Sequence, residues 1–482
     1  MGLGMHRATA DFAEVLGLGI IGGSILVLRS ERLAMTIAVI GGGISGLATA
    51  FYIEQLRRDS RIVLYEESDD VGGTMRTENV DGFLFESGGN GFLTNKPDTL
   101  ELVKDCGAES LLLPSSDAAR IRYIFTNRLH RLPETPVAFL RSELLGFSDK
   151  LRVAAEVFVP PRAATGDETL QSFGYRRVGR AFTDTFLDAM CAGIHASTPE
   201  RLSVNAAFPL VVQLEQQYGG LFKGMLKKRK RQAGPGGTLM SFRGGMSAFI
   251  RHLRSRLRAE VRTGTPVNEV QRAGQRYRLV TDAGTQAFDQ VVLATPAYVA
   301  SRLLRPLDDA LADALAKIEY SPIAVVGLGY RTLARPLDGF GLLTTSSAGK
   351  EILGVLWDSS IFADRAPPGC RSVRVMIGGQ RNPLLALKEE PELIEIACGG
   401  VRETMGVTEA PDVTFVKRWD RGIPHYRLGH LAVVGRIFAR VRELPSFFLN
   451  ANAYRGVGLN DCVANSRALA SRLANGCVLA PK

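Results

Sequence analysis

The chain has 482 residues, of which 45% are hydrophobic and 22% charged, a balance that excludes a wholly disordered or collagen-like protein. At about 150 residues per domain, the length predicts two or three domains or one large composite domain. The net charge of +10 favours anionic partners such as carboxylates, phosphates or an acidic membrane surface. The basic residues are mostly scattered and form no zinc-finger or RNA-binding signature, so we expect no nucleic-acid partner.

The cysteine pattern indicates a reducing compartment, and the histidine pattern gives no sign of a metal site. The six cysteines are dispersed without a CxxC, and the six histidines form no metal-ligand pattern. We therefore expect free thiols, no metal site and a cytoplasmic location.

Residues 1–34 form an extension of uncertain role. Within it, residues 15–28 are an apolar and glycine-rich run of 14 residues, which as a helix would reach about 21 Å, short of a bilayer. The run holds a GxGxxG pattern ending at Gly22, but only 12 residues separate Gly22 from Met35, too few for a βαβ unit. We interpret it as a dispensable extension, with membrane contact and an extra ordered element as alternatives.

A nucleotide-binding unit begins after this extension. Residues 36–40 (TIAVI) predict a buried parallel strand, and GGGISG at 41–46 leads into an amphipathic helix. A second apolar run, RIVLY, ends just before Glu66. Strand, glycine turn, helix, strand and acid form the full context of a Rossmann fingerprint. The glycines let the backbone approach a pyrophosphate at the helix N-terminus, and Glu66 accepts hydrogen bonds from a ribose.

The next segment indicates which dinucleotide is bound. The pattern E-x(5)-G-G-x-x-R, from Glu66 to Arg76, resembles the extended fingerprint of the FAD-binding amine oxidase superfamily. This resemblance implies FAD, with the glycines and Arg76 near the pyrophosphate and the ribityl chain. Two later segments agree: QVVLATP at 290–296 resembles a strand that returns to the nucleotide domain, and a helix follows NAYRGVGLNDC at 452–462. The N-terminus of that helix is expected to face the flavin.

Four strings together are similar to the oxygen-dependent protoporphyrinogen oxidase family: FESGGNGFL, SFRGGM, GIPHYRLGH and YRGVGLNDC. The resemblance implies an α/β fold with a Rossmann-like FAD-binding domain assembled from separated segments, a substrate domain with a mixed β-sheet, and a helical insertion. The expected ranges are 35–97, 236–297 and 440–476 for the FAD-binding domain, 98–133 and 298–439 for the substrate domain, and 134–235 for the insertion.

The resemblance, carried over residue by residue, also gives the expected cofactor contacts. They are Gly41, Gly42, Gly43, Ile44, Ser45, Gly46, Glu66, Gly73, Thr74, Arg76, Gly88, Gly89, Asn90, Gly91, Val267, Asn452, Val457, Gly458 and Leu459. One departure lies just before them, where the family often has Ala-Gly and this chain has Asn450 and Ala451.

The implied substrate is a reduced tetrapyrrole with propionate side chains, which needs an apolar slot and a cation. Residues 119–128 alternate like a strand, which would place Arg120 and Arg122 on one face. Arg122 matches the family arginine that binds a propionate, a task that suits its planar guanidinium; two solvated arginines are the alternative. We nominate Ile323, Phe340 and Trp357 for the apolar slot, with ordinary sheet core as the alternative.

The resemblance implies oxidation of protoporphyrinogen IX to protoporphyrin IX by FAD and oxygen, with release of hydrogen peroxide, in haem biosynthesis. We find no nucleophile elbow or acid pair, and a flavin oxidase needs neither, so the catalytic assignment depends on FAD and Arg122. The alternatives are coproporphyrinogen III oxidation, an inactive relative, and an amine oxidase or polyene desaturase of the same superfamily. An amine oxidase would offer an aromatic cage and a lysine, which we cannot place from the sequence.

Residues 134–235 are expected to be mainly helical and end in a basic run, KKRKR at 227–231, before a loop. Such a run is either a solvated loop or a contact with acidic lipid, worth about 1 kcal/mol per charge near the surface. Family members often associate peripherally with membranes, which implies contact with the inner membrane face and with haem-pathway enzymes. No segment is expected to span the bilayer.

Overall fold

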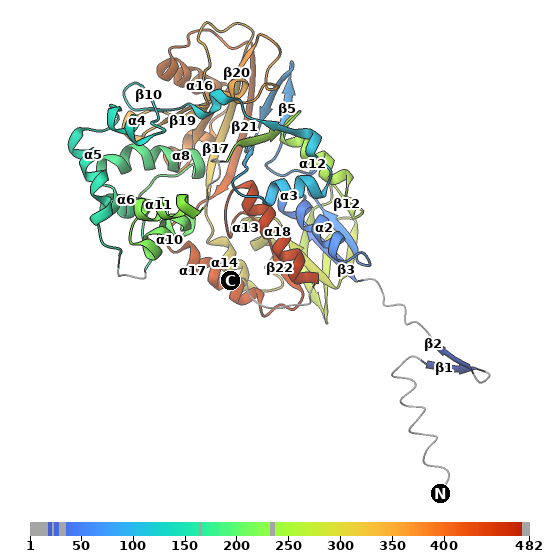
Figure 1. The fold of residues 1–482 in the computed structure, drawn as a ribbon. Coiled ribbons are helices and arrows are strands. Elements are labelled where there is room, and N and C mark those ends of the chain that lie inside the picture. Colours follow the sequence, from blue (N-terminus) through green and yellow to red (C-terminus); the bar gives the residue numbers. More distant parts are fainter. Residues whose placement is uncertain (1–17, 22–23, 28–34, 163–165, 232–236, 475–482) are drawn as a thin grey trace.

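Two large sheets organise the computed structural model, which describes residues 18–21, 24–27, 35–162, 166–231 and 237–474 (Figure 1). The first sheet is parallel, with strand order β12-β4-β3-β16-β22. Its strands are β3 (Thr36–Ile40), β4 (Arg61–Tyr65), β12 (Glu260–Arg262), β16 (Gln290–Leu293) and β22 (Phe447–Leu449). The expected α/β fold is confirmed.

Both faces of the parallel sheet are covered, which explains why its strands are continuous apolar runs. Ile37 and Val39 point toward α2 (Ile44–Leu56), α12 (Met246–Ser255) and α18 (Leu459–Ala474). Ala38 and Ile40 point to the opposite face. That face packs against β13 (Val267–Ala273), β14 (Arg276–Thr281), β15 (Gly284–Phe288), α13 (Ala297–Leu304), α14 (Asp309–Ala316) and α17 (His430–Val441).

The second sheet is mixed, because β9 and β18 run parallel and the other neighbours are antiparallel. In spatial order its strands are β10 (Leu129–Arg131), β9 (Arg122–Phe125), β18 (Gly341–Thr344), β19 (Ile352–Leu356), β20 (Arg371–Gly378), β17 (Tyr320–Tyr330) and β21 (Val413–Pro424). Helix α16 (Glu390–Met405) packs on this sheet and buries Leu393, Ala397 and Val401 in its core.

A block of short helices lies beside this mixed sheet, on the left of Figure 1. The block comprises α4 (Pro136–Arg141), α5 (Phe147–Ala154), α6 (Leu170–Arg177), α7 (Arg180–Phe182), α8 (Asp188–His195), α9 (Val204–Ala207), α10 (Pro209–Tyr218) and α11 (Leu221–Arg231). The described part of the chain contains no helix long and apolar enough to cross a membrane.

The remaining described strands and helices are short. They are β1 (Leu18–Ile21), β2 (Ser24–Val27), β5 (Thr77–Val80), β6 (Phe83–Glu86), β7 (Phe92–Leu93), α3 (Asp98–Asp105), β8 (Leu112–Pro114), β11 (Leu239–Phe242) and α15 (Asp358–Ile361). Strands β1 and β2 pair antiparallel with each other, so these described residues of the N-terminal run are strands rather than a helix. The rest of the extension lies outside the described residues.

Two local predictions were wrong. Arg120 does not share a strand with Arg122, because Asp117–Arg120 is a 3-10 turn in which Ser116 Oγ accepts from the backbone nitrogen of Ala119. The strand begins only at Arg122. The basic run at 227–231 is not a loop, because its backbone continues the helix α11.

Candidate active site

The glycine turn after β3 exposes the amino end of α2. Gly41 has φ +106, a conformation that side chains disfavour, and a Cβ on Gly46 would lie 1.9 Å from the carbonyl oxygen of Gly41. The N-cap residue, Gly43, has no side chain to cap the helix, and the first turn carries no acidic residue. The free N–H groups and the positive end of the helix dipole therefore form a site for an anion such as a pyrophosphate.

Glu66 stands at the end of the neighbouring strand and fixes this turn. Its Oε2 accepts from the backbone nitrogen of Gly42 at 2.7 Å, and its Oε1 accepts from that of Ser68 at 3.0 Å. A carboxylate oxygen has more than one acceptor position, so Glu66 can still accept from a ribose hydroxyl. The acid thus holds the turn and lines the cavity beside it.

A cavity of about 470 Å³ extends from this turn to the junction of the two sheets. Fourteen of the nineteen predicted cofactor residues line it: Gly41, Gly43, Ile44, Ser45, Glu66, Gly73, Thr74, Arg76, Gly89, Gly91, Asn452, Val457, Gly458 and Leu459. The structure therefore brings predicted contacts from residues 41–91 together with those from residues 452–459, near the other end of the chain.

The other five predicted cofactor residues lie just outside the cavity lining. Gly42 and Gly46 are inside the turn itself. A Cβ on Gly88 would come within 2.2 Å of the carbonyl oxygen of Thr74, so Gly88 permits close backbone packing. The side-chain nitrogen of Asn90 is buried without a hydrogen-bond partner among the described residues. Val267 is 6% exposed and packs in the core under the parallel sheet.

The loop at 86–91 is fastened by side chains from the mixed sheet. Arg374 Nη1 donates to the carbonyl oxygens of Glu86 and Gly88, and the indole nitrogen of Trp419 donates to that of Ser87 at 2.7 Å. The Glu86 carboxylate accepts from the backbone nitrogen of Met246, and burial raises the pKa of this carboxyl. The two halves of the molecule are therefore joined directly at the cavity wall.

The mixed sheet contributes a positive and aromatic wall that the sequence analysis missed. Lys417 and Trp419 are two residues apart on β21, and Arg421 follows in a bulge of the same strand. All three residues line the cavity. The ammonium of Lys417 lies 4.6 Å from the ring centre of Trp419. Tyr298 and Tyr320 line the same cavity. The alternating residues of KRWDR at 417–421 were the only sequence pattern that could have indicated this wall. The sequence alone does not show which face of β21 meets the other domain, and so it could not show which of these residues reach the cavity.

The lysine and aromatic rings that the sequence analysis could not place are therefore present. They come from β21, β17 and α13, which are separated in sequence but adjacent in space. Residues 294–296, Met246 and Cys462 also line the cavity and were not among the predicted contacts.

The C-terminal motif supplies a second helix N-terminus at this cavity, because α18 begins at Leu459 directly after Val457 and Gly458. Asn450 anchors the approach to it: its Nδ2 donates to Thr49 Oγ1 at 2.9 Å and to Ser466 Oγ at 2.8 Å. The segment is thereby tied to α2 as well as to α18.

Of the predicted substrate residues, Arg122 and Phe340 form a pair. Arg122 is exposed, and the centre of its guanidinium lies 5.2 Å from the ring centre of Phe340. Neither residue lines the cavity. Phe340 packs against Leu239, which pairs with Leu93 across β11 and β7, two residues past Gly91. The pair therefore lies near the same glycine loop.

The other two predicted substrate residues occupy core positions. Ile323 is 8% exposed and lies directly opposite Trp419, so the two side chains share one face of the sheet, but Ile323 is buried against Ala192 of α8 and does not line the cavity. Trp357 is 1% exposed; its indole nitrogen donates to Met405 Sδ at 3.4 Å, and its ring packs against Tyr123. Trp357 therefore packs as sheet core, the alternative that the sequence had left open, whereas Ile323 is buried between the mixed sheet and α8.

A buried histidine cluster lies behind the cavity. His425 Nε2 is 3.0 Å from Ser197 Oγ, and Tyr426 stacks on His430 with ring centres 4.2 Å apart. Tyr426 donates its hydroxyl to the carbonyl oxygen of Asn452, a cavity residue, at 2.5 Å. Burial lowers the pKa of His195, His425 and His430 to about 4, so all three are neutral at pH 7.

These features define a dinucleotide-binding oxidoreductase with its cavity between a parallel and a mixed sheet. Comparison with known families agrees: residues 44–473 match the model of the flavin containing amine oxidoreductases. The chain belongs to this family. It is therefore an FAD-dependent oxidoreductase.

Several characterised relatives match most of the chain. Human protoporphyrinogen oxidase is 32% identical over 90% of this chain and 97% of its own length. Chloroplastic protoporphyrinogen oxidase 1 of spinach is 30% identical over 88% and 81%. Coproporphyrinogen III oxidase of Bacillus subtilis is 28% identical over 90% and 97%.

Solved structures give the same fold. A protein from Exiguobacterium sp. 255-15, provisionally named protoporphyrinogen oxidase, superposes with a TM-score of 0.81 at 27% identity, covering 92% of this chain and 99% of that one. A triple mutant of putrescine oxidase gives a TM-score of 0.68 at 15% identity, covering 92% and 99%, which shows a shared fold alone.

The residues present fit FAD. The uncapped N-terminus of α2 and its glycine turn suit the pyrophosphate, and Glu66 offers acceptor oxygens at the ribose end. The N-terminus of α18 and the aromatic wall line the same cavity.

Proposed function

We propose that this enzyme oxidises protoporphyrinogen IX to protoporphyrin IX in haem biosynthesis, using oxygen as the final acceptor and releasing hydrogen peroxide. The observation that carries the proposal is its 32% identity to human protoporphyrinogen oxidase over 97% of that protein's length. Likeness across the whole length includes the substrate half, and not only the nucleotide-binding motif that many oxidoreductases share.

The proposed roles follow from the cavity. Bound FAD would accept the hydride that each oxidation removes from the substrate. The backbone amides at the start of α2 would hold the pyrophosphate, and Glu66 the ribose. The rings of Trp419 and Tyr320 line the cavity and would offer an apolar surface to a bound macrocycle.

Arg122 is our proposed propionate-binding residue. Its guanidinium is exposed on the first residue of β9 and lies beside the ring of Phe340. A planar guanidinium held in this way can pair with a carboxylate through two parallel hydrogen bonds. Phe340 would thus orient the arginine and offer an apolar surface to the ring system.

The deciding experiment offers the purified yellow protein protoporphyrinogen IX and coproporphyrinogen III side by side under air. Porphyrin fluorescence and peroxide are followed together, with protein-free samples to correct for spontaneous oxidation. We expect kcat/KM to be higher for protoporphyrinogen IX. A higher value for coproporphyrinogen III would instead assign the activity named for the Bacillus subtilis relative. No turnover of either compound would refute the proposal.

An amine oxidase is the second candidate, because Lys417 and Trp419 line the cavity together with two tyrosines. A lysine and aromatic rings are what such an enzyme would present to an amine substrate. Peroxide formation from putrescine or benzylamine would support this candidate, and its absence under conditions where a porphyrinogen is oxidised would remove it.

We also propose that the helical block contacts the inner face of a cytoplasmic membrane. Large apolar side chains are exposed there: Val137, Leu140, Phe147, Leu151, Phe158, Leu210, Met225 and Leu226. Met225 and Leu226 belong to helix α11, whose backbone ends in the basic run at 227–231. An apolar and basic surface suits anionic lipid. Such contact would let an apolar porphyrin pass to the next haem-pathway enzyme without crossing water.

A further inference from the structure

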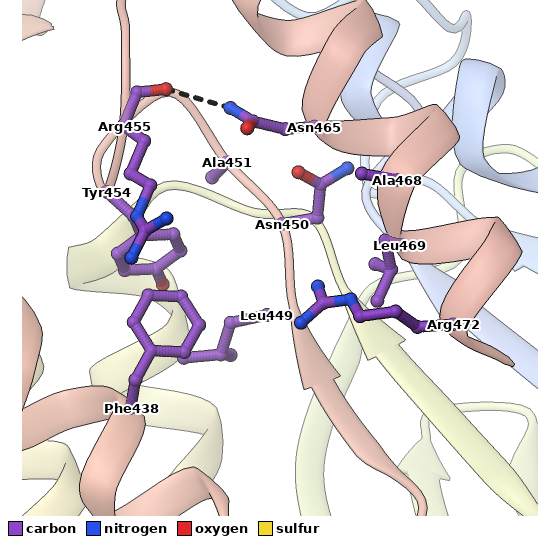
Figure 2. A pocket seen from close by; sticks show the side chains of 10 residues that line it. All are labelled: Phe438, Leu449, Asn450, Ala451, Tyr454, Arg455, Asn465, Ala468, Leu469 and Arg472. Atoms are coloured by element: carbon purple, nitrogen blue, oxygen red, sulfur yellow. Dashed lines mark hydrogen bonds between the residues drawn. The ribbon is translucent and has the colours of Figure 1, made fainter. Parts of the chain in front are cut away.

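A second cavity, of about 320 Å³, lies behind the C-terminal motif between α17, β22 and α18. Figure 2 shows Arg455 and Arg472 reaching into it from opposite sides, with Phe438 and Tyr454 along one wall and Leu449 between Phe438 and Arg472. Its volume is at the lower end of the range for small-molecule sites. The cavity therefore combines two cations with an apolar floor.

Two polar groups on residues that line this cavity have no hydrogen-bond partner among the described residues. The Nε–H of Arg472 and the hydroxyl of Tyr454 are buried, and neither has a hydrogen-bond partner within the described residues. Burial and the nearby charge of Arg455 lower the pKa of Arg472, and no acidic group of the described chain opposes this effect. Buried donors without partners are costly, and an anion would satisfy them.

The apolar part of the lining indicates that the ligand also has an apolar body. Phe438 and Tyr454 meet edge to face with ring centres 5.6 Å apart, and Leu449 and Leu469 complete this surface. A bare inorganic ion would leave these side chains in contact with water. A ligand with both an acidic head and a compact apolar body would fill the cavity.

We propose that this cavity binds a small organic carboxylate, with its head on the guanidinium of Arg472 and its apolar body against Phe438 and Leu449. The site is distinct from the proposed substrate site and does not depend on the substrate assigned above. Arg455 faces the same space and adds positive charge. A carboxylate matches the fork of a guanidinium better than a neutral polar group does.

A ligand bound in this cavity would affect the cofactor site through the backbone segment that the two cavities share. Ala451 lines both cavities, so the segment that walls off the second cavity also borders the first. A few residues later, Val457 and Gly458 lead into the helix N-terminus at the cofactor cavity. A ligand that orders this segment would therefore change the environment of the bound flavin.

The test uses the FAD-loaded enzyme and sodium 2-naphthoate as the probe, with uncharged 2-naphthamide as its comparison. Binding is measured by isothermal titration calorimetry, and the visible absorption of the flavin is recorded during the same titration. We expect saturable 1:1 binding of the carboxylate, much weaker binding of the amide, and a small shift of the flavin bands.

Two variants assign the binding to this cavity. Arg472→Gln should weaken naphthoate binding about 10- to 100-fold, the usual effect of losing one charged hydrogen bond. Ala468→Phe keeps both arginines but fills the cavity, so it should abolish binding even if the first variant folds poorly. The control is Arg436→Gln on α17, which removes an exposed charge that does not line the cavity.

Three results would overturn the proposal: no saturable binding to the wild type, equal binding of the amide, or unchanged affinity in both Arg472→Gln and Ala468→Phe. None of these readouts uses a porphyrinogen. A negative result would therefore leave the proposed function intact, and failure of the proposed function would leave this test valid.

Discussion

Arg374 Nη1 lies 2.9 Å from the carbonyl oxygen of Gly88, and this hydrogen bond ties the mixed sheet to the glycine loop of the cofactor cavity. The same nitrogen donates to the carbonyl oxygen of Glu86 at 2.6 Å, and Arg374 Nε lies 3.0 Å from Asp358 Oδ2. Arg374 and Asp358 are each 2% exposed or less, so their charges depend on each other. One buried arginine thus sets where a loop of one domain stands relative to the other.

Replacing Arg374 should lower the stability of the protein. Arg374→Met leaves Asp358 and two carbonyl groups unpaired in the interior, which should lower the free energy of unfolding by about 3–5 kcal/mol. Urea unfolding followed by circular dichroism measures the loss. Arg371→Met, on the same strand but exposed, should change stability by no more than about 0.5 kcal/mol. Equal stability of the two variants would contradict this role.

Glu66→Ala should weaken FAD binding about 10- to 100-fold, because it removes the acceptor for both the ribose and the Gly42 amide. Titration of flavin-free protein with FAD, followed by flavin fluorescence, gives the dissociation constant. Asp69→Ala removes an exposed acid three residues away and should have little effect. Wild-type affinity in the Glu66 variant would show that the acid does not bind the cofactor.

Arg122→Ala should raise the KM for a porphyrinogen about 10- to 100-fold while FAD stays bound, because one charged hydrogen bond to a propionate is lost. Steady-state kinetics and the flavin spectrum separate these two effects. Arg120→Ala is a close control, since Arg120 is exposed and pairs with Asp117 outside the strand. An unchanged KM in the Arg122 variant, or an equal rise in both, would remove its proposed role.

Membrane contact should depend on the exposed rings of the helical block. Phe147 and Phe158 are 78% and 86% exposed, and changing both to serine should reduce flotation with anionic liposomes at low salt roughly tenfold or more. Leu384→Ser is the matched control, because Leu384 is also 78% exposed but lies outside the block. High salt should weaken flotation of the wild type. Recovery of the wild type only in the soluble fraction would contradict membrane contact.

The buried histidines should make the protein less stable in mild acid. Their folded pKa values, lowered to about 4, lie below the ordinary value of 6.5, so between these values the unfolded chain binds more protons than the folded one. Stability is therefore complete above pH 6.5 and falls as the pH drops toward 4, by up to about 1.4 kcal/mol per pH unit for each histidine.

Urea unfolding at pH 7, 6 and 5 measures this slope. His425→Gln removes one of the three groups and should make the slope shallower, since most carboxylates titrate below this range. A slope identical to that of the wild type would mean that His425 is not held neutral by the fold.

The sequence by itself determined the nucleotide-binding half. The apolar run before Gly41, the glycine spacing, the following helix and Glu66 are consecutive, and each follows from local backbone geometry and hydrophobic periodicity. The sequence also indicated FAD and the family, because those motifs are contiguous strings. The sequence-based prediction of a strand through Arg120 failed because a local hydrogen bond from the backbone nitrogen of Ala119 to Ser116 Oγ favours a turn there.

Only the tertiary structure decided which side chains complete the cavity. Lys417 and Trp419 come from a strand whose cavity-facing side depends on its pairing with β17 and on a bulge beyond Trp419. Ile323 shares the face of Trp419 but is covered by Ala192 of α8, and Trp357 packs into the core of the mixed sheet, so neither lines the cavity. Long-range pairing leaves no local pattern in the chain, and so the contacts that join the two sheets, such as that of Arg374 with Gly88, became visible only in the folded molecule.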